Sequence, residues 1–258
     1  MNQSNINSKK SIIQNIKNFK IYLNERFPLG KNSIFVLIFT LSGYIYTGLL
    51  YNSKIINQIF SKEIKVPMPW HKIVALFIII FMFFLQLRIT DEFKDYEEDL
   101  KYRAYRPVQR GVVTLKALGK IGIATVIIQI ILAYIIDFKI IYFMIIVWFY
   151  MFLMAKEFFI KEWLTKRILI YALSHVVIMI FITLVIVNAT QYIILGEAEN
   201  IFKFVALQRY RHNIDIALIP LFTLNYLNGI VLEIGRKTRR ADEEEHGVQT
   251  YSKLWGKK

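Results

Sequence analysis

The chain has 258 residues, of which 55% are hydrophobic and 15% aromatic, and its formal net charge is +14. A soluble domain of this length rarely combines that composition with uninterrupted apolar runs of helix-spanning length, so the chain is predicted to be a membrane protein. It contains no cysteine, which excludes disulfides, thiolate metal sites and cysteine nucleophiles.

The order of polar and apolar segments predicts the architecture. Residues 1–32 are polar and basic, and we expect them to form a cytoplasmic segment ahead of a membrane domain at 33–258. Apolar segments that cross a bilayer core of about 30 Å must be helical, because open backbone groups have no partner in lipid. The predicted fold class is therefore all-α, a polytopic transmembrane helical bundle. Its six predicted spans lie near Ser33–Tyr51, Ile73–Leu87, Ile121–Ile136, Ile140–Ala155, Ile168–Val187 and Ile216–Leu232.

The distribution of lysine and arginine predicts the orientation of the spans. Of the 33 basic residues, 25 lie in segments 1–32, 88–120, 156–167 and 233–258, and 8 lie in the alternating connections. Because loops rich in Lys and Arg face the cytoplasm, the N-terminus and these four segments are predicted to be cytoplasmic. Topology thus accounts for the positive charge, so the expected partner is the lipid bilayer and no nucleic acid is expected.

An acidic repeat follows the second predicted span. Asp91, Asp95 and Asp99 are spaced i, i+4, i+8, and they share one face if the helix of that span continues through them. Stacked carboxylates repel one another unless a cation is present. Arg103 and Arg106 follow at once, with side chains suited to phosphate. The pattern is open to two interpretations, a solvated helix end or a magnesium-bridged diphosphate site.

A second acidic cluster, Asp242 to Glu245, follows the last predicted span within a segment rich in arginine. Its two interpretations are a solvated tail and a second metal-binding segment. The residues alone leave both interpretations open.

These motifs carry a resemblance to a known family. Asp91-Glu92-x-x-Asp95-x-x-x-Asp99 resembles the first aspartate-rich motif of the UbiA superfamily of intramembrane prenyltransferases. The stretch from Arg106-Pro107 to Gly111 is similar to the segment that follows it in that family. The cluster at Asp242 stands where the second motif is found. The arrangement is closer to a less-characterised bacterial branch than to the quinone-pathway enzymes.

The resemblance implies a magnesium-dependent transfer of a polyprenyl group from its diphosphate to a lipophilic, aromatic acceptor, in a bacterial inner membrane. It implies Asp91, Asp95 and Asp99 as catalytic residues. The implied Mg2+ ligands are Asp91, Glu92, Asp95, Asp99, Asp242 and Glu243, and the implied diphosphate ligands are Lys94, Arg103, Arg106 and Lys156.

The chain also departs from the family pattern. Relatives have nine spans, so we expect the last three helices to be absent and the membrane domain to be C-terminally truncated. Aligned on Gly247, the first aspartate of the second motif falls at Arg239, and Glu233 is the alternative ligand. Two other functions therefore stay open, a non-catalytic remnant and a cation or solute transporter. Transport is the less favoured, because transporters place their charges near the bilayer midplane.

Polar residues inside the spans are candidates for a substrate cavity. His175 in the fifth span either satisfies a neighbouring helix or relays a proton, and the structural role is favoured. Asn225 and Asn228 are spaced i, i+3 and are expected to face the bundle, by hydrogen bonding between helices or by lining the cavity. Glu233, at the end of the sixth span, completes this set.

Overall fold

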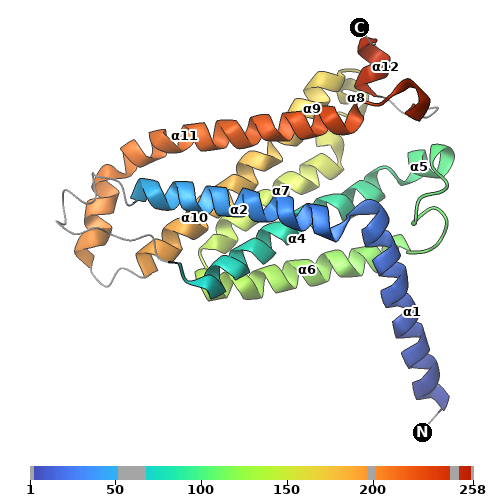
Figure 1. Cartoon of the computed structure of the whole chain (residues 1–258), viewed down its shortest axis with the longest axis horizontal. Helices are drawn as coiled ribbons and strands as arrows, with labels where there is room; N and C mark the ends of the chain where they lie inside the picture. Colours follow the sequence, from blue (N-terminus) through green and yellow to red (C-terminus); the bar gives the residue numbers. More distant parts are fainter. Residues whose placement is uncertain (1–2, 52–67, 197–200, 245–249, 257–258) are drawn as a thin grey trace.

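The computed structural model describes the chain as one bundle of helices (Figure 1). In the part of the chain that it describes there are helices and no strands, which confirms the all-α prediction. The described residues are 3–51, 68–196, 201–244 and 250–256.

The helices follow one another with short connections. The long helices are α1 Gln3–Arg26, α2 Leu29–Tyr51, α4 Trp70–Lys94, α6 Leu115–Ile136, α7 Ile140–Ala155, α9 Ile168–Val176, α10 Ile178–Gly196 and α11 Ile201–Lys237. The short ones are α5 Tyr96–Tyr102, η1 Glu157–Phe159, α8 Lys161–Thr165, η2 Ala241–Glu243 and α12 Tyr251–Trp255.

Five segments are long and apolar enough to cross a membrane, and α7 is a shorter apolar helix of 16 residues. The five are Leu29–Leu50, Trp70–Lys94, Leu115–Ile136, Ile168–Ile194 and Ile216–Lys237. Each overlaps a span predicted from the sequence. The chain is therefore a multi-pass integral membrane protein.

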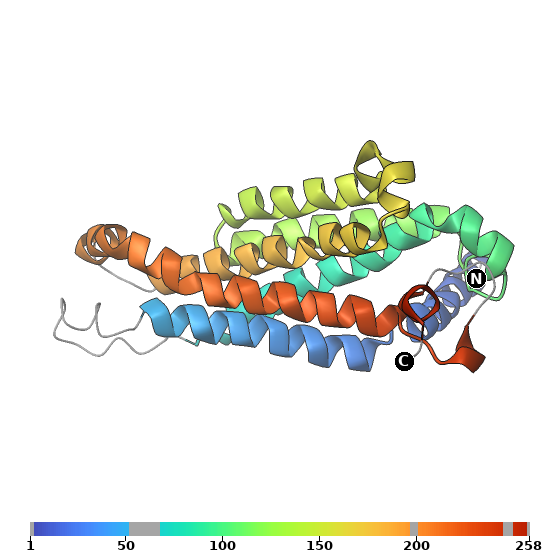
Figure 2. The same cartoon turned by 90° about the horizontal axis from the view of Figure 1, so that it is seen from above.

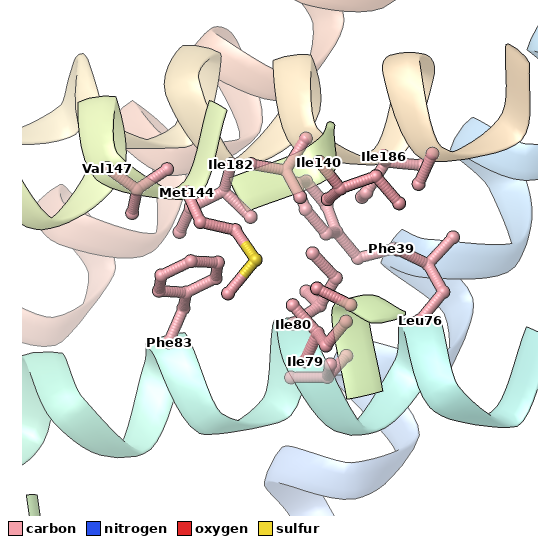
Figure 3. Close-up of a cluster of buried hydrophobic side chains, with 14 of the residues drawn as sticks. Phe39, Leu76, Ile79, Ile80, Phe83, Ile140, Met144, Val147, Ile182 and Ile186 are labelled. Carbon is pink, nitrogen blue, oxygen red and sulfur yellow. The ribbon is translucent and has the colours of Figure 1, made fainter. Parts of the chain in front are cut away.

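The core of the bundle lies where α2, α4, α7 and α10 pack together (Figure 3). Phe39 of α2, Leu76 and Phe83 of α4, Met144 of α7 and Ile182 of α10 are all buried in one cluster. The side chains are aliphatic or aromatic, so van der Waals packing holds the helices together where lipid removes the hydrophobic driving force between them.

Some predicted boundaries are wrong. The second span extends past Leu87 to Lys94, so Asp91 lies within the spanning helix α4. The fifth span is two helices, because the chain tightens at Val177, whose carbonyl accepts from the N–H of Ile180 three residues later. The N-terminal segment, expected only to be polar and basic, forms the helix α1.

The four basic segments gather at one end of the bundle. α5, α8 and α12 lie at the same end as α1 in both views (Figures 1 and 2). This end is called the basic end below, and it is defined by residues 3–31, 88–120, 156–167, 233–244 and 250–256. Both acidic segments belong to it.

Candidate functional site

The last turn of α4 places two carboxylates at the basic end. Asp91 accepts a hydrogen bond from Arg88 one turn earlier, and its Oδ1 lies 4.0 Å from Nζ of Lys94. Oδ1 of Asp95 lies 3.9 Å from the same ammonium. The side chains of Asp91 and Asp95 are 32% and 39% exposed. Both carboxylates are therefore reachable and share one lysine.

The helix does not continue straight through the acidic repeat, which corrects the prediction of one continuous helical face. α4 ends at Lys94 and α5 begins at Tyr96, with Asp95 at φ −94° and ψ 7° between them. The N–H of Asp95 still donates to Asp91 at 2.9 Å, and that of Asp99 to Asp95 at 2.9 Å. The i, i+4 backbone pattern is kept, but Asp99 belongs to a different helix.

Asp99 and Glu92, the other predicted ligands of the first repeat, are buried in ion pairs. Asp99 is 1% exposed and accepts hydrogen bonds from Arg103 at 2.9 Å and from Arg106. Glu92 is fully buried and accepts from Nε of Arg26 in α1 at 2.6 Å. The prediction that these two carboxylates bind magnesium stays untested, while their present partners are guanidinium groups.

Three arginines thus stand beside two buried carboxylates. Burial lowers the pKa of the Arg106 guanidinium, and the charges of Arg26 and Arg103 lower this pKa further, while Asp99 opposes them. The guanidinium groups are suited to phosphate, because arginine binds phosphate in a bidentate manner.

A tyrosine in α9 ties the end of α4 to the end of α11. Nζ of Lys94 donates to the Tyr171 hydroxyl at 2.7 Å, and Nζ of Lys237 lies 5.0 Å from the centre of the Tyr171 ring. Tyr171 also stacks on His175, with ring centres 4.1 Å apart. The name junction is used below for Asp91, Lys94 and Asp95 of α4, Tyr171 and His175 of α9, and Glu233, Arg236 and Lys237 of α11.

His175 has one satisfied and one free nitrogen. Its Nδ1 lies 2.8 Å from the carbonyl oxygen of Tyr171, which accepts only, so Nδ1 carries the proton. Nε2 therefore holds a lone pair, and this buried atom has no hydrogen-bond partner among the described residues. The predicted structural role of His175 is thus a hydrogen bond to the backbone of its own helix. Its Nε2 can act as a base.

Glu233, the acidic residue that α11 contributes to the junction, forms ion pairs within its own helix. It accepts from Arg236 at 2.7 Å and from Lys237 at 2.9 Å, and its side chain is 14% exposed. Asp242 and Glu243 are exposed at η2, and Oδ1 of Asp242 lies 3.4 Å from Nε of Arg240. Gly247, which aligns the second motif, lies outside the described residues.

The remaining candidates differ in their surroundings. Asn225 is buried and donates to Thr183 of α10 at 3.0 Å, the expected hydrogen bond between helices. Asn228 is exposed, so the prediction that both asparagines face the bundle is wrong. Asn228 lies seven residues after the buried Leu221 and so on nearly the same side of α11, but the described helices do not cover this side at the level of Asn228. Lys156 is exposed at the end of α7.

Within the described ranges, no group of three or more histidine and acidic side chains is arranged to hold a metal ion. Asp91 and Asp95 are nevertheless a fitting pair, because magnesium binds proteins through one or two carboxylates together with phosphate oxygens. Burial raises the pKa of the Asp95 carboxyl, and Asp91 and Asp99 raise it further, while Lys94 opposes them. Of the two carboxylates, Asp95 is therefore the one whose ionised form its surroundings disfavour.

Three sets of residues were missed by reasoning from the sequence. Tyr171 gave no signal, because a tyrosine near the end of an apolar segment is common at membrane interfaces. Glu157 precedes α8 in a left-handed stretch, φ 47° to 61° over three residues, and its buried Oε2 has no partner in the described chain. Gln86 in α4 donates to Thr125 at 2.9 Å and Gln129 at 2.7 Å of α6, and a glutamine within an apolar span was the available signal.

Comparison with protein-family models, with curated proteins and with solved structures returns no match for this chain. The fold and the site therefore define its class, an all-α multi-pass membrane protein with a charged junction of carboxylates, lysines, tyrosine and histidine at its basic end.

Proposed function

We propose that the chain is an intramembrane prenyltransferase that uses magnesium to transfer a polyprenyl group from its diphosphate to a lipophilic, aromatic acceptor. One observation carries the proposal. Two reachable carboxylates, Asp91 and Asp95, stand beside Lys94, which donates to Tyr171, and Lys237 of α11 lies over the ring of the same tyrosine at the end of a membrane bundle. This is the combination of charges that a metal-bound diphosphate on a lipid chain requires.

We assign a role in the reaction to each of these side chains. Asp91 and Asp95 would hold magnesium, which neutralises charge on the departing diphosphate. Lys94 and Lys237 bind phosphate oxygens from the side of Tyr171, and the arginines beside Asp99 bind them from the side of α5. The prenyl carbon–oxygen bond breaks with its electron pair leaving on diphosphate, and the acceptor forms the new bond to that carbon. Nε2 of His175 takes the proton that the acceptor loses.

We place the basic end in the cytoplasm of a bacterium and the spans in its inner membrane. The support is the concentration of Lys and Arg in the four segments that gather there. The diphosphate would then be drawn from the cytoplasmic side, while its chain stays in lipid.

The proposal is tested by binding and turnover in nanodiscs. Purified protein is incubated with radiolabelled geranyl, farnesyl and longer prenyl diphosphates, with and without magnesium. We expect magnesium-dependent binding and release of diphosphate, reduced at least tenfold in Asp91→Asn and in Asp95→Asn. Glu97→Gln is the matched control, because Glu97 is an exposed carboxylate of the same segment and its loss should leave binding unchanged.

Two results would overturn the proposal. One is the lack of magnesium-dependent binding to any of the diphosphates in protein that is folded by circular dichroism. The other is binding that persists unchanged in both aspartate variants.

A further inference from the structure

One apolar stripe runs along α1. Ile16, Phe19 and Leu23 are spaced i, i+3, i+7, so they lie on one face of the helix. The C-terminal part of this stripe is covered, because Phe19 and Leu23 pack against a cluster that contains Leu85 of α4 and Leu118 of α6. Both partners belong to membrane-spanning helices, so α1 crosses the bundle at the level where those helices end.

The N-terminal part of the same stripe is uncovered. Ile16 is 64% exposed and Ile13 is 53% exposed. α1 runs crosswise to the bundle and extends past its edge (Figure 1), so no other described part of the chain lies over these side chains. A helix that leaves the bundle at this level, crosswise to the spans, continues along the surface of the bilayer.

The charges of α1 match an anionic surface. Lys17 and Lys20 are exposed beside the stripe, and on the opposite face Gln14 donates to Asn18 at 2.8 Å. The whole helix carries five basic residues, Lys9, Lys10, Lys17, Lys20 and Arg26, and one acidic residue, Glu25. A helix with an apolar face and flanking lysines lies in the interface, where anionic lipid attracts the lysines.

We propose that α1 is an interfacial helix that binds anionic phospholipid in the leaflet at the basic end. Ile13 and Ile16 enter the boundary between headgroups and acyl chains. Lys17 and Lys20 contact the lipid phosphates, with their stems along the apolar surface. This anchoring is independent of the transferase activity proposed above.

The lack of native cysteine allows a single-site test in the full chain. Ile16→Cys and Gln14→Cys are each spin-labelled and placed in vesicles of phosphatidylglycerol with phosphatidylcholine, or of phosphatidylcholine alone. Positions 14 and 16 lie about 160° apart on the helix. In vesicles with phosphatidylglycerol we expect the label at 16 to collide at least threefold more often with oxygen than with a water-soluble nickel complex, and the label at 14 to show the reverse.

The role of charge is tested in the same background. Lys17→Gln with Lys20→Gln should reduce the oxygen preference at position 16 at least twofold in vesicles with phosphatidylglycerol. Lys161→Gln with Lys166→Gln, two exposed lysines of the same end, should leave it unchanged. Equal nickel access at positions 14 and 16 would overturn the proposal. So would exclusion of both oxygen and nickel from position 16 in either lipid, which would indicate a second copy of the chain on this face.

Discussion

The two acidic segments of the basic end have similar compositions and different surroundings. In the first, Asp99 and Glu92 are buried against arginines, and Asp91 and Asp95 are half-buried beside Lys94. In the second, Asp242 is exposed. Its neighbour Glu244 accepts hydrogen bonds from Thr250 and Ser252, which lower the pKa of its carboxyl.

The comparison indicates that packing, rather than the number of carboxylates, makes an acidic segment a candidate site. The first segment extends a helix that packs against α6 and contacts Tyr171 of α9, and Arg26 of α1 reaches its Glu92. The second follows the last turn of α11, where Asp242 and Glu243 are exposed. Four predictions test this contrast, and they are given in order of decreasing effect.

The largest effect is expected for Asp99→Ala. It removes the buried carboxylate that accepts from Arg103 and Arg106, whose side chains are 12% and 13% exposed. Breaking a buried ion pair by removing one partner costs about 3 kcal/mol or more in the free energy of unfolding. The measurement is unfolding by SDS in mixed micelles, with Glu97→Ala as the exposed control. A change of less than about 0.5 kcal/mol would remove the contrast between buried and solvated carboxylates.

Tyr171→Phe probes the contact between α4 and α9 within the junction. The ring stays, and the acceptor for Nζ of Lys94 is lost, so we expect a loss of about 1 kcal/mol in the free energy of unfolding. Tyr142→Phe on the exposed face of α7 is the control, because this side chain is 64% exposed. The same loss in both variants would show that the hydroxyl at the junction has no special role.

Asp95→Asn separates stability from function through pH. Because burial and nearby carboxylates raise the pKa of Asp95 in the folded state, ionisation of Asp95 destabilises the fold, and this cost appears as pH rises through the raised pKa. Without magnesium, the variant should be at least as stable as the wild type at pH 8. The difference between their melting temperatures should become smaller at acid pH. Magnesium should raise the melting temperature of the wild type only.

Melting curves between pH 5 and pH 8, with and without magnesium, measure this prediction. A wild type that is clearly more stable than Asp95→Asn at pH 8 without magnesium would mean that Asp95 is a structural residue. Asp95 would then have a structural role, like Asp99, and would not be a metal ligand.

The smallest effect is expected for Asp242→Asn combined with Glu243→Gln. Both side chains are exposed, so the free energy of unfolding should change by less than about 0.5 kcal/mol. Binding of magnesium and prenyl diphosphate, measured as above, should also be unchanged. A tenfold loss of binding at unchanged stability would instead make the second segment part of the site, as its resemblance to the family motif implies.

The sequence alone determined the class of fold and the sidedness of the charge. Apolar runs of spanning length leave only helices, because the bilayer offers no partner to open backbone groups, and the basic segments found together at one end were identified by counting lysine and arginine. Predictions from residue spacing were wrong at Asp95, where the helix breaks, and at Asn228, which is exposed although Leu221 on nearly the same side of α11 is buried.

Only the tertiary structure decided which carboxylates stay reachable. Glu92 is neutralised by Arg26, 66 positions away, and Lys94 meets Tyr171, 77 positions away. These pairings depend on how helices cross and rotate against one another, which the packing of many apolar side chains sets jointly. The spacing of residues along one segment does not specify this rotation. It therefore predicts that Asp91 and Asp99 share one helix face, although their surroundings differ.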